Sequence, residues 1–272
     1  MEDGRVNGRC FVGFFGLNRS LRWTAPSIRR HILDPLRAAG FTPVLAAHFN
    51  QPAVIHHPSS NEQAVKVRRD LKMSLPFDLQ WVEPQQDTNI AELVEPVLAV
   101  PFRDYDDPTG GTRRNILHQL HSLRRLRSMA GLLGDQPFDA FLMLRPDIEY
   151  IDPLDIEGLK AVVRGDVDMV SPSWHQYGGL NDRFAFCNHK AAEAFMSRWD
   201  HVASHCQAHG YIHPETLLAE AIQKAGIRLR TTDQRALRVR ATGETFAEGF
   251  RLGKIKRVAH RARPLLRTLG VA

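Results

Sequence analysis

The sequence is poor in cysteine, with three residues in 272. Cys10, Cys187 and Cys206 form no even set and have no metal-type spacing, a pattern typical of a reducing, cytosolic compartment. No apolar run approaches the roughly 20 residues that a membrane-spanning helix needs. The early apolar segment CFVGFFGL is short and lacks a small-residue cleavage site, so we interpret it as a strand and not as a signal peptide.

Several short enzyme motifs are absent as well. The chain has no GxGxxG or GxxxxGK[ST] phosphate-binding loop and no HExxH motif of zinc proteases. It shows no internal repeat and no long low-complexity linker. With 272 residues, of which 43% are hydrophobic, it can bury a substantial core in one large domain or two small ones.

The formal net charge of +6 belongs to one end of the chain. Residues 249–272 hold seven Lys or Arg and no Asp or Glu, which leaves 29 basic and 30 acidic groups in residues 1–248. The overall charge therefore gives little support to a nucleic-acid partner. We predict a domain over 1–248 and a basic amphipathic tail over 249–272. Such a tail suits an anionic membrane surface, so the expected location is cytoplasmic and peripheral at the inner face of the membrane. A docked C-terminal helix is the alternative.

Strands alternate with helices along the chain, which predicts an α/β fold with a mostly parallel central sheet flanked by helices. The first unit has a strand at 9–16, a loop at 17–24, a helix at 25–40 that Thr24 can cap, and a strand at 41–50. Such a strand–helix–strand unit favours parallel pairing. The other predicted segments are strands at 79–84, 98–102, 138–144, 166–172, 184–187 and 227–231, and helices at 112–133, 153–163, 189–208 and 214–226.

Ligands of such sheets bind outside the carboxyl ends of the strands, so the loops at that edge are the first places to look for chemistry. The loop after the first strand places Gly16, Asn18, Arg19, Ser20 and Arg22 just before a helix. Free backbone N–H groups and arginines there suit phosphate. A solvated polar loop is the alternative.

A second candidate is the segment FDAFLMLRPDIEY, residues 138–150. Asp147 and Glu149 alternate out of an apolar run and point to one face, where two carboxylates could hold Mg²⁺ or Mn²⁺. Arg145 lies on the same face and would neutralise the cluster, which weakens the case for a cation. Ordinary strand-end charges are the alternative.

A third candidate is the loop SWHQYGGLNDR. Gly178 and Gly179 allow a mobile backbone, Trp174 and Tyr177 offer platforms on which sugars stack, and Asp182 could act as general base for a hydroxyl nucleophile. Turn chemistry alone also explains an Asn-Asp pair before a strand.

The fourth candidate is YIHPETLLAEA, with His213 and Glu215 at a helix start, where helix capping is the competing explanation. The pair His56-His57 and the pair His118 and His121 are expected to be surface or packing residues.

Taken in order, the strand–loop–helix with NRS, the long helix leading into FDAFLMLRPDIEY, the segment GGLNDRFAF and the segment HPETLLAEAI resemble bacterial glycosyltransferases of the GT-A type. The resemblance covers most of residues 10–232. It implies a nucleotide-sugar donor, a saccharide or lipid-linked acceptor, and a role in capsule, lipopolysaccharide or related surface-glycan assembly. It also implies an inverting direct displacement with Asp182 as base.

The resemblance further implies roles for individual residues. The donor-binding set is Gly16, Asn18, Arg19, Ser20, Thr24, Asn50, Arg114, Arg145 and Asp147. The acceptor-binding set is Trp174, Tyr177, Gly178, Gly179 and Asn181. The catalytic set is Asp182 and Glu215, and the metal ligands would be Asp147 and His213. Because Arg145 replaces the first carboxylate of the family's Asp-x-Asp, the enzyme either binds Mn²⁺ or Mg²⁺ or is metal-independent and neutralises the diphosphate with arginine.

Two other functions fit parts of the sequence. A sulfotransferase also begins with a strand, an Arg-Ser loop and a helix that binds nucleotide phosphate, although Leu-Arg-Trp-Thr stands where its Gly-Thr-Thr is usual. A non-catalytic module docked at a membrane by its basic tail is the non-enzyme alternative.

Overall fold

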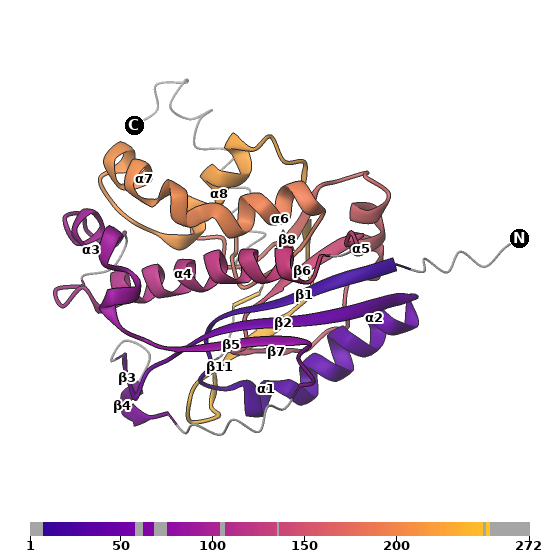
Figure 1. The fold of residues 1–272 in the computed structure, drawn as a ribbon, viewed down its shortest axis with the longest axis horizontal. Helices are drawn as coiled ribbons and strands as arrows, with labels where there is room; N and C mark the ends of the chain where they lie inside the picture. Colours follow the sequence, from indigo (N-terminus) through magenta and orange to yellow (C-terminus); the bar gives the residue numbers. More distant parts are fainter. Residues whose placement is uncertain are drawn as a thin grey trace, which may run out of the picture.

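The computed structural model describes residues 8–57, 62–67, 75–103, 107–134, 136–246 and 249–250. A seven-stranded sheet in the order β10-β8-β9-β6-β1-β2-β5 forms its centre (Figure 1). Its strands are β1 Gly8–Leu17, β2 Phe41–Gln51, β5 Leu79–Pro84, β6 Ala140–Leu144, β8 Met169–Pro172, β9 Phe184–Cys187 and β10 Leu229–Thr232. All neighbours are parallel except β9, which is antiparallel to β6 and β8. The predicted α/β fold with a mostly parallel central sheet is confirmed.

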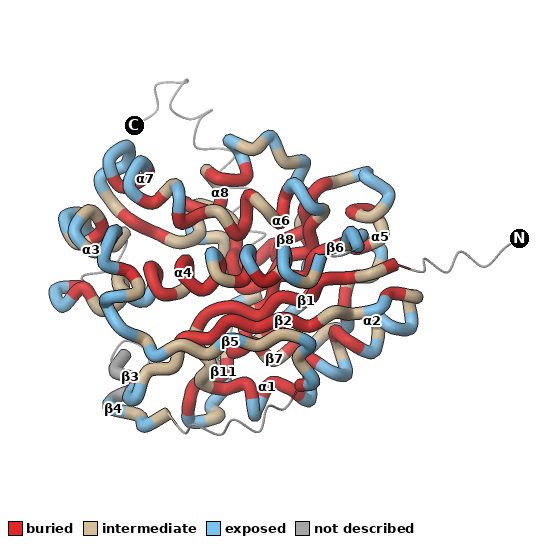
Figure 2. Tube along the Cα trace, viewed as in Figure 1, coloured by how far each residue is buried: buried red, intermediate tan, exposed pale blue. Residues whose placement is uncertain are grey.

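Helices cover both faces of this sheet. One face carries α3 Ala91–Leu98, α4 Gly111–Leu132, α6 His189–Met196, α7 Val202–His209 and α8 Pro214–Lys224. The other carries α1 Leu21–Ile28, α2 Asp34–Ala38 and α5 Ile156–Val163. Side chains of β1 alternate between the two apolar clusters, with Phe11 and Phe15 in one and Val12 and Phe14 in the other. The central strands are accordingly buried along most of their length (Figure 2).

Two smaller sheets complete the fold. β7 Ile148–Tyr150, β11 Ala236–Val239 and β12 Thr245–Phe246 form an antiparallel sheet in the order β12-β11-β7. β3 Val54–His57 pairs with β4 Glu62–Lys66. Neither sheet was predicted, because their strands are too short for an alternating pattern to stand out. The basic tail was predicted over 249–272, of which residues 251–272 lie outside the described residues.

Several predicted boundaries were wrong. The first helix begins at Leu21 rather than at 25, so Thr24 lies inside it and does not cap it. Residues 98–102 form no strand: α3 ends at Leu98, and Phe102 makes only an isolated bridge with Ile212. The helix predicted over 189–208 is interrupted by the 3₁₀ segment Ser197–His201, and η3 Asp87–Asn89 is a second short 3₁₀ turn.

The helix predicted over 25–40 contains a π-helical turn, Arg29–Leu33, between α1 and α2. Pro35 has no N–H with which to bond the carbonyl of His31, four residues earlier. That carbonyl instead accepts the N–H of Leu154 at 2.7 Å. The proline therefore leaves a backbone acceptor that fastens this helix to the chain entering α5.

No helix among the described residues is both long and apolar enough to cross a bilayer.

Candidate functional site

The carboxyl ends of β1, β2 and β6 meet at a pocket of about 180 Å³. Five residues of the predicted donor set line it: Gly16, Arg19, Asn50, Arg145 and Asp147. Its other walls include Gln119 from α4, Phe102 and Pro214, together with Arg238 and Arg240 from β11 and the residue after it. The expected edge of the sheet therefore does hold a pocket, and it is rich in arginine.

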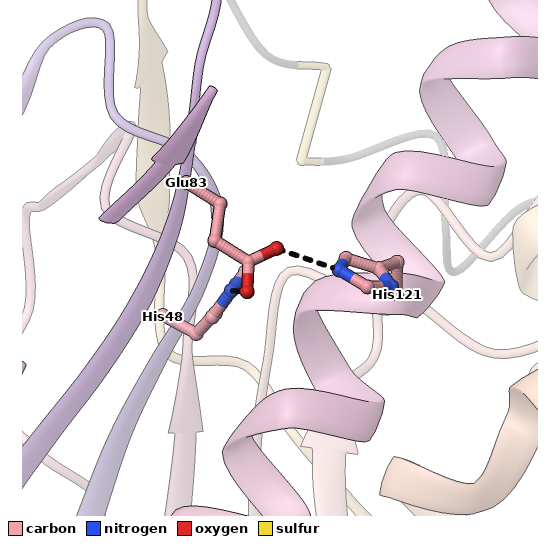
Figure 3. Close-up of side chains that lie close together, drawn as sticks. All are labelled: His48, Glu83 and His121. Carbon is pink, nitrogen blue, oxygen red and sulfur yellow. Dashed lines mark hydrogen bonds and ion pairs between the residues drawn. The ribbon is translucent and has the colours of Figure 1, made fainter. Parts of the chain in front are cut away.

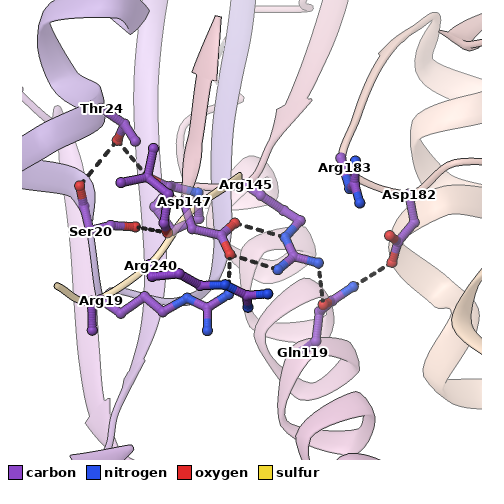
Figure 4. Close-up of polar contacts among 12 residues, drawn as sticks. Arg19, Ser20, Thr24, Gln119, Arg145, Asp147, Asp182, Arg183 and Arg240 are labelled. Atoms are coloured by element: carbon purple, nitrogen blue, oxygen red, sulfur yellow. Dashed lines mark hydrogen bonds and ion pairs between the residues drawn. The ribbon is translucent and has the colours of Figure 1, made fainter. Parts of the chain in front are cut away.

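Asp147 lies at the centre of the polar contacts (Figure 4). Its carboxylate accepts two hydrogen bonds from Arg145, from Nε and Nη2, both at 2.9 Å, and a third from Arg19 at 2.7 Å. The residue is only 2% exposed. Burial alone would raise the pKa of Asp147, but the charges of Arg145 and Arg19 outweigh it and hold that pKa well below its usual range. Asp147 is therefore ionised and fully engaged.

A second buried carboxylate, Glu62 of β4, continues the network. It accepts a hydrogen bond from Arg19 at 2.7 Å and another from the backbone N–H of Ala241 at 2.9 Å. Arg240 lies 3.6 Å from the same side chain. Arg19 thus joins two buried carboxylates that come from segments far apart in the sequence.

Among the described residues of this site, guanidinium groups outnumber carboxylates. Arg19, Arg145, Arg238 and Arg240 line the pocket, against the carboxylates of Asp147 and Glu62 in the same network. Burial, together with repulsion from Arg183 and Arg145, lowers the pKa of Arg238 to about 10. Its Nε is buried without a hydrogen-bond partner. Arg238 stays charged at neutral pH, so the arginines of the pocket repel one another, and a bound anion would reduce that repulsion.

The site connects to Asp182 through Gln119. The amide oxygen of Gln119 accepts from Arg145 at 3.3 Å, and its amide nitrogen donates to Asp182 at 2.5 Å (Figure 4). Arg198, which is fully buried, lies 3.6 Å from Asp182. Asp182 is itself 2% exposed and does not line the pocket, because the side chain of Gln119 lies between them.

The surroundings of Asp147 do not fit Mn²⁺ or Mg²⁺. These ions take oxygen ligands, whereas both oxygens of Asp147 are bonded to arginine. The other predicted ligand, His213, has Nδ1 3.0 Å from Glu215. Among the described residues, neither Asp147 nor His213 belongs to a group of three or more ligand side chains that could share an ion.

Four predicted donor residues lie outside the pocket lining. Ser20 is 1% exposed and donates to the carbonyl of Val239 at 2.9 Å, while Thr24 is fully buried and donates to the carbonyl of Pro146 at 2.6 Å. Both hold the walls of the pocket rather than a ligand. Arg114 donates to the carboxylate of Asp87 and to the backbone carbonyl of Thr109. Asn18 precedes Arg19, which lines the pocket, but is not itself part of the lining.

The predicted acceptor loop packs on the start of α8. The N–H of Leu180 donates to the carbonyl of Glu215 at 2.9 Å, and a Cβ on Gly179 would lie only 2.0 Å from that oxygen. Gly178 has φ +78°, so both glycines are required by the loop's path. Tyr177 is 46% exposed, its hydroxyl lies 2.6 Å from Nδ1 of His175, and its ring contacts that of His213.

Two acceptor residues are placed differently from the prediction. Trp174 is 1% exposed, its Nε1 donates to the carbonyl of Gln234 at 2.9 Å, and the guanidinium of Arg183 covers its ring at 5.0 Å. It is a core residue and offers no platform for a sugar. Asn181 is also 1% exposed and holds the loop by donating to the carbonyl of Trp174.

Sequence reasoning missed Gln119, Glu62, Arg198, Arg238 and Arg240. One signal was available: the alternation LRVR over residues 237–240 places Arg238 and Arg240 on one face of a strand. No pattern marks Glu62 or Gln119. A larger cavity of about 700 Å³ lies at the opposite end of β6, but Arg127 and Glu193 pair there at 2.6 Å and no buried charge cluster lines it.

No protein-family model matches the chain, and no curated protein sequence matches it. Among solved structures, the apo form of mouse xyloside xylosyltransferase 1 is similar to it with a TM-score of 0.40 and 14% sequence identity. The similarity covers 83% of this chain and 85% of that one.

We predict that Asp147→Asn lowers the free energy of unfolding by about 3–5 kcal/mol, because it removes the carboxylate that hydrogen-bonds Arg145 and one of the two that hydrogen-bond Arg19. Urea denaturation measures the loss. The matched control is Asp166→Asn, since Asp166 pairs with Arg164 at the surface and such pairs contribute at most about 1 kcal/mol. Equal stability of the two variants would contradict the role given to Asp147.

We also predict that Gly179→Ala destabilises the protein by about 3 kcal/mol or more, because backbone atoms of Glu215 and Thr216 occupy the space of the new methyl group. Gly131→Ala is the control: no atom lies within 4 Å of its Cβ position, on α4, and a stabilisation of about 0.5–1 kcal/mol is expected. Thermal unfolding of the two proteins would show opposite shifts. A Gly179→Ala protein as stable as the wild type would show that the loop is not packed on α8.

Proposed function

We propose that the chain is a glycosyltransferase that moves a sugar from a nucleotide-sugar donor to a saccharide or lipid-linked acceptor. The observation that carries the proposal is the buried arginine cluster at the carboxyl ends of β1 and β6. Arginines there take the place that a divalent cation holds in metal-dependent enzymes. The ordered sequence segments that resemble GT-A-type glycosyltransferases support the same assignment.

Charge and size both suit a diphosphate. Counted over the described residues of the network, four guanidinium groups stand against two carboxylates, an excess of positive charge that suits a diphosphate. Guanidinium groups also bind phosphate oxygens in a bidentate manner. The volume of about 180 Å³ is below the roughly 300 Å³ at which ordinary ligand pockets begin, so the pocket takes the diphosphate while the nucleoside and the sugar extend beyond it.

The proposed reaction is a single displacement. Asp182 takes the proton of the acceptor hydroxyl, the acceptor oxygen bonds to the anomeric carbon, and the bond from that carbon to the phosphate oxygen breaks. The nucleoside diphosphate leaves with the bonding electrons, and Arg19, Arg145 and Arg238 stabilise the charge that develops on it. The amide of Gln119 hydrogen-bonds Asp182, so the acceptor hydroxyl reaches Asp182 by displacing that amide or by entering beside it. Glu215 is the second candidate for the base.

We expect one or more nucleotide sugars in a thermal-shift panel to raise the melting temperature of the full chain. Arg238→Gln should weaken that binding by about 10–100-fold, since a charge-assisted hydrogen bond contributes roughly 1.5–3 kcal/mol. Arg164→Gln is the control, because Arg164 is 55% exposed and pairs with Asp166 at the surface. A shift with a sulfate-donor nucleotide but with no nucleotide sugar would favour a sulfotransferase instead.

With the donor identified, Asp182→Asn should lower the turnover number by about 10²–10⁴-fold while donor affinity stays near that of the wild type, as expected for loss of a general base. Product formation by the variant and by Glu215→Gln separates the two candidate bases. Near-normal turnover of Asp182→Asn, with a large loss in Glu215→Gln, would transfer the role to Glu215. Normal turnover of both would remove this mechanism.

A further inference from the structure

Three ligand-type side chains meet outside the arginine pocket. His48 comes from β2, Glu83 from β5 and His121 from α4, and their side chains converge (Figure 3). Nε2 of His121 lies 3.0 Å from one oxygen of Glu83, and Nε2 of His48 lies 3.6 Å from the other. His48 is fully buried and His121 is 7% exposed, so the expectation that His121 is a plain surface or packing residue leaves this arrangement unexplained.

The hydrogen bonds of Ser122 fix the state of His48. The single hydroxyl hydrogen of Ser122 is donated to the carbonyl of His48 at 2.7 Å. Its oxygen already accepts the N–H of Gly16 at 2.7 Å, and Nδ1 of His48 lies 3.0 Å away. Since Ser122 has no second hydrogen to give, Nδ1 of His48 must be the donor. A neutral His48 therefore carries a lone pair on Nε2.

That lone pair faces a carboxylate. Nε2 of His48 is buried without a hydrogen-bond partner, and the nearest charged group is an oxygen of Glu83. Two acceptors facing each other in a buried site repel unless a cation lies between them.

We propose that His48, Glu83 and His121 bind one Zn²⁺ ion. Ligand atoms of a tetrahedral zinc site at its usual bond lengths are about 3.4 Å apart, and the separations of 3.0 and 3.6 Å bracket that value. Imidazole nitrogen selects zinc over Mg²⁺ or Ca²⁺, which prefer all-oxygen sites. Both histidines bind through Nε2 as Nδ1–H tautomers, and Ser122 is the outer partner that orients His48.

Arg125 is the charge that competes with a cation here. Its guanidinium lies 3.2 Å from the Glu83 oxygen that also faces His48, and 4.9 Å from the ring of Trp81. The side chain is 41% exposed, so it can keep an outer hydrogen bond to the carboxylate or turn into solvent.

The position of the site indicates a structural role. The pocket residues Asn50 and Gln85 each lie two positions after a ligand, and His118 lies one helical turn before the third. One ion would thus join the edge strand β5 to β2 and α4 directly beneath the arginine pocket. The site does not depend on the function proposed above, and zinc binding tests it separately.

A second group, His205, His209 and Glu220, provides the control. Its carboxylate is already engaged, because Lys224 pairs with one oxygen of Glu220 at 2.6 Å and both histidines contact the other. His209 is also 42% exposed. Removing His209 therefore tests whether any zinc found on the protein resides there.

The test uses the full chain, stripped with a chelator and titrated with Zn²⁺ against a chromophoric competitor. We expect one Zn²⁺ per chain, and a rise in melting temperature of about 5–10 °C at a free concentration near 100 times the dissociation constant. His121→Gln should lose this binding and His209→Gln should keep it. Ser122→Ala should weaken it by about 10–100-fold. Co²⁺ in the wild type should give the visible absorption of a site with nitrogen ligands and low coordination number.

Wild-type protein that takes up no stoichiometric Zn²⁺ overturns the proposal. So does stoichiometric binding that survives both His121→Gln and Glu83→Gln, or binding that His209→Gln abolishes. Circular dichroism checks that each variant is folded. If His121→Gln does not fold, Glu83→Gln, which keeps the shape of the side chain, gives the comparison.

Discussion

One buried carboxylate, that of Asp147, organises this edge of the molecule. It receives three charge-assisted hydrogen bonds from Arg145 and Arg19, and its backbone carbonyl accepts the N–H of Val239 at 2.8 Å. These contacts tie together the loop after β1, the turn after β6 and the end of β11. Without Asp147, Arg145 would lose the carboxylate it hydrogen-bonds and Arg19 would keep only Glu62, a loss of charge pairing that packing does not readily compensate.

The carboxylates hold the arginines in place but do not balance them. Arg238 and Arg240 add positive charge to a network that Asp147 and Glu62 only partly neutralise, and burial lowers the pKa of both guanidinium groups. Such a cluster is oriented before a ligand arrives, so an anion or a developing negative charge meets fixed dipoles and charges without further reorganisation. This is the physical basis on which we propose diphosphate binding.

Local patterns in the sequence predicted the sheet well and the site in part. Apolar runs marked β1, β2 and β6, because strands buried on both faces are long apolar segments. Arg19, Arg145 and Asp147 stood at the ends of such strands and do line the pocket. Gln119 could not be foreseen, since it lies in the middle of a helix and reaches the site only through packing.

Burial and long-range contacts explain the other differences between prediction and structure. Trp174 was expected to offer an aromatic platform to a sugar, yet its ring lies in the core and is covered by Arg183. His48 and His121 are 73 positions apart and showed no ligand spacing, and only the parallel pairing of β2 with β5 under α4 brings them to Glu83. Long-range contacts of this kind leave no trace in local spacing.

The central claim is that arginine, not a divalent cation, binds the donor diphosphate. Calorimetric titration of the full chain with the nucleoside diphosphate of its preferred donor tests this most directly, in buffer with and without added Mn²⁺ or Mg²⁺. We predict one binding event whose affinity is the same in both buffers and falls with rising salt concentration. Binding that occurs only when the divalent cation is present would contradict the account.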